Sequence, residues 1–255
     1  MGNKKHTKYE RLNVQHRKEA AVYDRARAWT DIAPLTAESV KDLNFSPKKT
    51  AVLDIAAGTG RVSEYFRDKA KFVIGYDLSP DMLGVAQAEK RIDFGVVGPG
   101  ERLPFLDDSF DLVYCRSALH YMNVPKALEE WVRVTRDGGT IVIGDVSFED
   151  EALNRWYHRM LVCLYSEFRL VRHQWIMKIL KKLGQRKTDY AIHMVRGSVD
   201  DVARRKQIGP RRTARLKKMF ETAPIHVRKG LHIEKAGSDY QFDFGWAITR
   251  CHVKK

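Results

Sequence analysis

The sequence has few cysteines, no long apolar run and no excess of acidic residues. Its three cysteines, Cys115, Cys163 and Cys251, are far apart and odd in number, which argues against a disulfide framework or a zinc cluster. Nine scattered histidines suggest no metal site either. No run approaches the roughly 20 apolar residues that a transmembrane helix needs. We therefore expect a protein in a reducing, cytoplasmic setting without a membrane span.

The first twenty residues, "MGNKKHTKYERLNVQHRKEA", are charged and lack the apolar stretch of a secretory signal. His6 also stands where a myristoylation pattern requires Ser or Thr. The chain has 255 residues, of which 44% are hydrophobic, enough for one large domain or two modest ones. These features predict a globular protein and no lipid anchor at this end.

Basic residues outnumber acidic ones, and the excess is concentrated in one segment. The chain has 46 Lys and Arg against 32 Asp and Glu, a net charge of +14 at pH 7. Between Arg169 and Lys229 we count 18 basic and 4 acidic residues, a surplus of 14 that equals that of the whole chain. The location of this charge therefore bears on function more than its size does.

Short apolar runs alternate with segments of helical spacing up to residue 150. The runs are typical of strands buried on both faces of a parallel sheet. They are "TAVLDIA" (50–56), "KFVIGYD" (71–77), "IDFGVV" (92–97), "FDLVYC" (110–115) and "TIVIGDVS" (140–147). Helices are expected over 58–70, 79–90 and 124–136, with Ser79 as N-cap and Pro80 at the first position of the second. This alternation predicts a doubly wound α/β sheet.

The remainder of the chain is expected to be a helical block followed by two strands. Residues 151–184 place aromatic and aliphatic side chains at helical spacing, and further helices are expected with Ser198 as N-cap and from Pro210. "APIHVRKGLHIEK" (223–235) and "YQFDFGWAITR" (240–250) are expected to be the closing strands of a mostly parallel, seven-stranded sheet.

The stretch "AVLDIAAGTGRV" (51–62) predicts a ligand-binding turn. Gly58 and Gly60 allow a sharp turn and a close approach of the backbone, and a helix beginning near Gly60 would direct free N–H groups at a ligand. Asp77 ends the second strand, 23 residues after Asp54, where an acid can accept hydrogen bonds from a ribose diol. These features suit an adenosine ligand. "DIAAGTG" does not supply GxGxxG, which argues against a nicotinamide dinucleotide.

The ordered motifs "VLDIAAGTG", "GYDLSPDML", "GERLPFLDDSFDLVYCRSALHYM" and "RVTRDGGTIVIGDVS" resemble those of the class I S-adenosylmethionine-dependent methyltransferases. Within that family, they are similar to the small-molecule group that includes the ubiquinone and menaquinone biosynthesis methyltransferases. The resemblance covers about residues 15–147. It implies a Rossmann-like fold with S-adenosylmethionine as cofactor and S-adenosylhomocysteine as product. It also implies three parts: N-terminal helices with the cofactor-binding half of the sheet (1–150), an inserted helical, basic lid (151–225) and closing strands (226–255).

The resemblance assigns cofactor contacts residue by residue. The methionine end would lie against the loop from Asp54 to Gly60, Asp77 would hold the ribose hydroxyls, and Arg116 would lie beside the methionine portion. Leu78 and Met82 would line the adenine, and Gly100, Glu101, Arg102 and Leu103 would flank its other face. Two positions depart from the family pattern: Ala56 replaces the first glycine, and Pro99 replaces an acid that meets the adenine amino group. Pro99 predicts weaker discrimination of adenine.

The expected reaction is an in-line displacement in which a nucleophile attacks the methyl group of a sulfonium, and the protein aligns the reactants. His120 follows the fourth strand, so it is our candidate for orienting or deprotonating the acceptor, with packing or helix capping as the alternative. Tyr23 resembles the N-terminal tyrosine that closes over the cofactor in this group, although an amphipathic helix also explains it. Asp111 is expected to fix a strand start.

The basic and aromatic segment over residues 151–225 does not identify the methyl acceptor. It could be a solvated face over a core, a cover for an aromatic, apolar or anionic small molecule with an O, N or C nucleophile, or an RNA-binding surface over residues 169–229. No motif of RNA amine or pyrimidine methylation and no separate RNA-binding module is present, which favours a small molecule. A non-catalytic, cofactor-binding scaffold is a further alternative. The sequence does not predict an oligomeric state.

Overall fold

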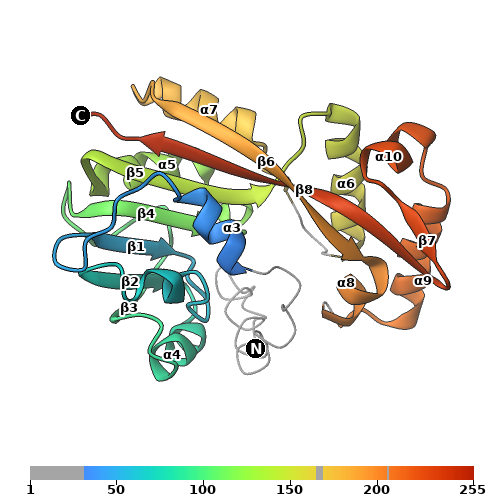
Figure 1. Cartoon of the computed structure of the whole chain (residues 1–255), viewed down its shortest axis with the longest axis horizontal. Helices are drawn as coiled ribbons and strands as arrows, with labels where there is room; N and C mark the ends of the chain where they lie inside the picture. Colours follow the sequence, from blue (N-terminus) through green and yellow to red (C-terminus); the bar gives the residue numbers. More distant parts are fainter. Residues whose placement is uncertain (1–31, 165–168, 206) are drawn as a thin grey trace, which may run out of the picture.

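The computed structural model describes residues 32–164, 169–205 and 207–255. Its core is one sheet with the strand order β3-β2-β1-β4-β5-β8-β6, and β7 pairs with β8 (Figure 1). The strands are β1 (Ala51–Ile55), β2 (Phe72–Asp77), β3 (Phe94–Val97), β4 (Phe110–Arg116), β5 (Thr135–Val146), β6 (Thr188–Ser198), β7 (Glu234–Ala236) and β8 (Asp239–His252). Strands β1 to β5 pair in parallel, and β8 runs antiparallel to both β5 and β6. The predicted doubly wound, mostly parallel sheet is therefore confirmed.

Helices cover both faces of the sheet. They are α3 (Ile32–Ser39), α4 (Pro80–Ala88), α5 (Val124–Val134), α6 (Glu151–Leu164), α7 (His173–Lys182), α8 (Val199–Arg205), α9 (Pro210–Glu221) and α10 (Ile225–Gly230), with 3-10 helices η2 (Ser63–Phe66) and η3 (Leu119–Tyr121). Neighbouring strand residues alternate between two buried clusters: Leu112 belongs to the cluster that includes α4 and α6, and Val113 belongs to that of α5 and α7. This alternation is why the strand sequences are apolar throughout.

Local signals at three helix starts are confirmed. Ser79 accepts a hydrogen bond from the Met82 backbone N–H at 3.3 Å, with Pro80 at the first helical position. Ser198 caps α8 through the Asp201 N–H at 3.1 Å, and α9 begins at Pro210. A serine N-cap accepts a free N–H of the first helical turn, and a proline at the first position has no N–H that needs a partner. Both effects act within a few residues, so the sequence alone predicts these helix starts.

Two predicted elements are wrong. The helix expected over 58–70 is reduced to the 3-10 helix η2, and Gly58 and Gly60 at its expected start have left-handed φ values of +57° and +77°. The strand expected over 223–235 is helix α10 followed by the three-residue β7. The sixth long strand is instead β6, which interrupts the block that was expected to be helical.

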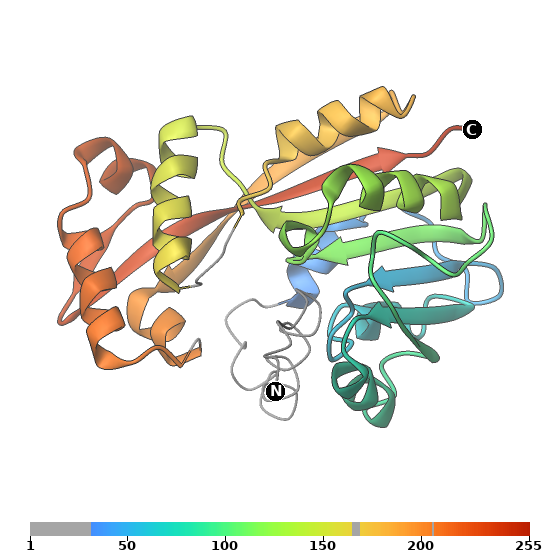
Figure 2. The ribbon, with the colours of Figure 1, turned by 180° about the vertical axis from the view of Figure 1, so that it is seen from behind.

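Strands β6 and β8 extend beyond the main sheet and carry a second group of elements (Figures 1 and 2). We call α6, α8, α9, α10 and β7, with the adjoining parts of β6 and β8, the small lobe. Its interior is aromatic, with Phe220 4.7 Å from Phe242 and 5.0 Å from Trp156 between ring centroids. The small lobe shares one buried cluster with the sheet face beneath α4. Among the described residues, no helix combines the length and apolar character needed to cross a membrane.

Candidate functional site

The loop after β1 takes left-handed backbone conformations at three of the predicted positions. Ala56, Gly58 and Gly60 have φ values of +56°, +57° and +77°. A Cβ on Gly58 would meet no atom within 4 Å, so the space in front of this glycine is open. A Cβ on Gly60 would lie 2.9 Å from the Ala86 Cβ, so Gly60 permits packing against α4. Gly58 is thus the glycine that leaves room for a ligand.

Asp54 is a buried carboxyl beneath this loop. It accepts a hydrogen bond from the Ser63 hydroxyl at 2.6 Å, and the residue is 2% exposed. Burial raises the pKa of Asp54 to about 7, with a further increase from the neighbouring Asp77, while the Ser63 hydrogen bond opposes the shift. The carboxyl therefore changes its charge near neutral pH, directly beneath the predicted methionine end.

Asp77 joins the two loops that would hold an adenosine. One carboxylate oxygen accepts the Gly58 N–H at 2.8 Å, and the other accepts the Ser79 N–H at 2.8 Å. Asp77 thereby ties the turn at Gly58 to the start of α4. Leu78 beside it is half-buried, whereas Met82 is 1% exposed in α4 and lies inside the protein.

The predicted adenine-flanking segment is held in place by the residues around it. Trp131 donates from its indole nitrogen to the Gly100 carbonyl at 2.9 Å, and the Tyr76 hydroxyl donates to the Arg102 carbonyl at 2.9 Å. Glu101 accepts the Asn123 N–H at 2.8 Å. Leu103 is buried, and Glu130 accepts its N–H at 2.8 Å. The segment therefore has a fixed backbone next to the end of β2.

A histidine and a carboxylate lie together at the ends of β4 and β5. His120 Nδ1 is 3.3 Å from Asp145 Oδ2, and both side chains are 8% exposed. Burial, together with the charge of Asp145, raises the pKa of Tyr157 on α6. The Arg116 guanidinium lies over the Trp246 ring, 4.8 Å from its centroid. We call these two pairs, together with Tyr157, the acceptor cluster.

Most of the predicted residues share the carboxyl edge of the sheet. We call this edge, at the ends of β1, β2, β4 and β5, the site edge; it carries Asp54, Asp77, Arg116 and His120. Sequence analysis missed Asp145, Tyr157 and Trp246 as members, although Asp145 lies within the quoted "GDVS" motif. Tyr23 falls outside the described residues. No group of three His, Cys, Asp or Glu in the described ranges could hold a metal ion.

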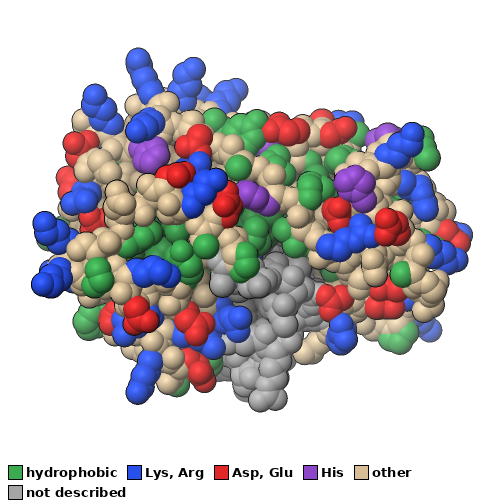
Figure 3. Space-filling model, viewed as in Figure 1, with side chains coloured by type: hydrophobic (Ala, Val, Ile, Leu, Met, Phe, Trp, Pro, Cys, Tyr) green, Lys and Arg blue, Asp and Glu red, His purple; other side chains and the backbone are tan. Residues whose placement is uncertain are grey.

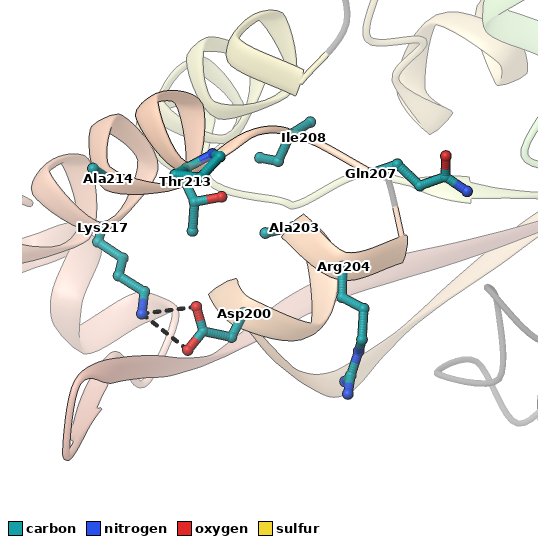
Figure 4. A pocket seen from close by; sticks show the side chains of 9 residues that line it. Asp200, Ala203, Arg204, Gln207, Ile208, Thr213, Ala214 and Lys217 are labelled. Carbon is teal, nitrogen blue, oxygen red and sulfur yellow. Dashed lines mark hydrogen bonds and ion pairs between the residues drawn. The ribbon is translucent and has the colours of Figure 1, made fainter.

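A cavity of about 630 Å³ lies between α8 and α9 in the small lobe (Figure 4). Its lining includes Ala203, Ile208 and Ala214, with Lys217 at one side. The Lys217 ammonium is 2.7 Å from the Asp200 carboxylate, so its charge is already neutralised. None of the predicted cofactor or catalytic residues lines this cavity.

The comparisons with known proteins agree with this geometry. A family model described as a methyltransferase domain matches residues 53–143. A demethylmenaquinone methyltransferase of Renibacterium salmoninarum is 36% identical over 137 residues, which are 53% of this chain and 52% of that protein. The chain thus spans about half the length of this curated relative. An uncharacterised protein of Methanocaldococcus jannaschii, MJ1123, is 32% identical over 171 residues, 66% of this chain and 78% of that one.

The fold also matches a solved structure. The crystal structure of the YcgJ protein from Bacillus subtilis covers 86% of this chain and 98% of its own length, with a TM-score of 0.78 and 22% identity. The motifs, the sheet order and these relatives together place the chain in a known class. It belongs to the class I S-adenosylmethionine-dependent methyltransferases.

Proposed function

We propose that the protein binds S-adenosylmethionine at the site edge and transfers its methyl group to a small-molecule acceptor held at the acceptor cluster. The observation that carries the proposal is that the predicted cofactor-binding turn and the acceptor cluster lie at the same edge of the sheet. The open turn at Gly58, tied to Asp77, lies at the ends of β1 and β2, and the His120–Asp145 pair lies at the ends of β4 and β5. In doubly wound sheets, ligands bind at this edge.

The residues present fit the cofactor. Gly58 leaves open space, Asp77 places a carboxylate at the end of β2 beside the position proposed for the ribose, and Asp54 places a carboxyl beneath the position proposed for the cationic methionine end. When bound, the cofactor supplies an electrophilic methyl group, so the protein has little covalent chemistry to perform. Its own contribution is to hold the acceptor in line and to exclude water.

His120 would orient the acceptor and take its proton. Because Nδ1 is directed at Asp145, Nε2 is the nitrogen through which the ring would accept a proton, and Asp145 would stabilise the resulting cation. The acceptor cluster includes the aromatic rings of Tyr157 and Trp246, which favours an aromatic acceptor with an acidic hydroxyl or carbon. The Renibacterium salmoninarum relative, named for demethylmenaquinone, is consistent with this choice. Residues 151–225 would form the lid. We also place the protein in the cytoplasm, since its three cysteines are unpaired.

Calorimetric titration with S-adenosylmethionine and with S-adenosylhomocysteine tests the first half of the proposal. Mass spectrometry should first show whether either compound is carried through purification. We expect saturable micromolar binding. Folded, ligand-free protein that binds neither compound would overturn the proposal.

Release of S-adenosylhomocysteine with a panel of phenolic, carboxylated and amine acceptors tests the second half. In the His120→Gln variant, we expect turnover to fall by about 10²-fold to 10⁴-fold, the range for loss of a general base, while cofactor affinity is unchanged. Asp145→Asn should lower turnover less and shift its pH profile. Full turnover in His120→Gln would remove the proposed role of this residue.

A further inference from the structure

The basic segment forms two separate surfaces in the fold. One lies on α8 and α9 in the small lobe. The other, which we call the α7 patch, consists of side chains from α7, the turn after it and the C-terminal segment: Lys178, Lys181, Lys182, Arg186, Lys187 and Lys254. All six residues are exposed, and none forms an ion pair with another described residue. Figure 3 shows Lys and Arg side chains gathered at the upper left edge, where Figure 1 places α7.

The backbone brings these charges together. Lys178, Lys181 and Lys182 share one face of α7 because they are three and four positions apart. Gly184 has φ +84° and turns the chain after the helix, where the Gln185 N–H donates to the Leu180 carbonyl at 2.9 Å. The Gln185 side chain then accepts the Lys254 backbone N–H at 2.9 Å and donates to its carbonyl at 3.1 Å, which fixes Lys254 beside the turn that carries Arg186.

The α7 patch lies at the edge of the sheet opposite the site edge. Thr188 pairs with Cys251 at the start of β6, and Thr140 pairs with His252 where β5 first pairs with β8. Asp145 is five residues further along β5, about 17 Å at the usual rise per strand residue. The patch therefore cannot contact an acceptor at His120, and its charge needs a different explanation.

The composition of the patch distinguishes among its possible partners. The helix dipole favours Lys181 and Lys182 in the last turn of α7, but it does not account for Arg186, Lys187 or Lys254. Protein interfaces are depleted in lysine and enriched in aromatic residues, whereas this patch has five lysines and no exposed apolar side chain. A membrane surface site would also need apolar residues to insert. Unpaired cations alone suit a chain of phosphates.

We propose that the α7 patch is a docking surface for the phosphate backbone of nucleic acid, bound without reading the bases. The surface on α8 and α9 differs because acids neutralise three of its cations, although Arg211, Arg212 and Arg215 are exposed there and form no ion pair with another described residue. Arg204 pairs with Asp201, Lys217 pairs with Asp200, and Lys218 pairs with Glu221. The proposal does not depend on methyl transfer, since the patch is distant from the site edge.

Fluorescence anisotropy with a labelled 20-nucleotide RNA and the matching DNA, over a series of KCl concentrations, tests the proposal. Six phosphate contacts on a single strand predict a slope of log affinity against log salt of about −4. The quadruple variant Lys181→Gln, Lys182→Gln, Arg186→Gln, Lys187→Gln should bind at least about tenfold more weakly at low salt, with a slope of about −1.5. RNA and DNA should behave alike.

The matched control removes the same charge from α9: Arg211→Gln, Arg212→Gln, Arg215→Gln and Lys218→Gln. We expect its affinity to stay within about threefold of the wild type, because local docking rather than net charge determines binding. Circular dichroism and S-adenosylmethionine titration show whether both variants keep their fold and cofactor site. Equal weakening by both variants, no binding by the wild type at 50 mM KCl, or tighter binding to phosphatidylglycerol vesicles than to RNA would overturn the proposal.

Discussion

The site edge and the small lobe are built in opposite ways. At the site edge, buried carboxylates hold the backbone of short loops: Asp77 binds two N–H groups, and Asp54 binds Ser63. The small lobe is held by aromatic contacts, with Phe220 at the centre and basic side chains on the outside. A substitution at the site edge should therefore alter ligand affinity more than stability, and a substitution in the small lobe should do the reverse.

Replacing Phe220 with alanine tests the small-lobe side of this comparison and should have the largest effect. The side chain is 1% exposed and belongs to the same buried cluster as Val52 in β1 and Phe66 in η2. Loss of the ring should lower the free energy of unfolding by about 3 to 5 kcal/mol, in a single urea transition followed by circular dichroism. Ile225→Ala, at a residue 69% exposed in the same lobe, should change it by less than about 0.5 kcal/mol. Two separate transitions would contradict the shared cluster.

Asp77→Ala tests the site edge. The substitution removes the acceptor for the Gly58 and Ser79 N–H groups and for the proposed ribose bonds. S-adenosylmethionine affinity measured by calorimetry should fall by about 2 to 3 kcal/mol, or about 30-fold to 150-fold.

Asp111→Ala is the matched control for Asp77→Ala. Asp111 accepts the Ala51 N–H at 2.7 Å at the start of β1, as expected of a residue that fixes a strand start, but it lies at the opposite edge of the sheet. We expect it to lower stability without changing cofactor affinity. Similar affinity losses in both variants would mean that Asp77 acts only by supporting the fold.

Much of the site edge could be predicted because its signals are local. Glycines at left-handed positions, an acid at a strand end and Ser-Pro at a helix start each act within a few residues. Asp145 and Trp246 could not be assigned in this way. Asp145 meets His120 through the pairing of β4 with β5, in which Arg116 pairs with Gly144. Trp246 meets the site only through the register of β5 with β8, in which Val146 pairs with Trp246, and no local motif encodes either pairing.

In the small lobe, local sequence patterns predicted the wrong secondary structure for β6 and α10. Strand β6 is at the edge of the sheet and only partly buried, so Tyr190 and Met194 are exposed where a clean alternation would bury one face. The segment at Ile225 has β-branched residues that favour a strand, yet it forms α10 because Val227 and Leu231, four positions apart, are both buried. Tertiary packing overrides a weak β propensity.

The pH dependence of the free energy of unfolding tests the raised pKa of Asp54 at the site edge. Its folded-state pKa of about 7 lies above the ordinary value of 3.8, so the folded protein binds this proton more tightly than the unfolded chain does. The resulting stabilisation is present below pH 4 and is lost as the pH rises through 7. Asp54→Asn should therefore become more stable than the wild type with rising pH, by about 1 to 3 kcal/mol between pH 4 and pH 8. Parallel curves in urea unfolding would contradict the raised pKa.

The smallest effects are expected from two single substitutions, Ala56→Gly and Gly58→Ala. The two residues have nearly the same φ, +56° and +57°. Ala56→Gly should raise the free energy of unfolding by about 1 kcal/mol, because a left-handed backbone costs about that much for a residue with a Cβ. Gly58→Ala should lower it by a similar amount, since its Cβ would meet no neighbouring atom and only the backbone is strained. That Cβ would nevertheless occupy the open space proposed for the cofactor. Calorimetry should accordingly show weaker S-adenosylmethionine binding in Gly58→Ala and unchanged binding in Ala56→Gly; equal affinities would place the cofactor elsewhere along the site edge.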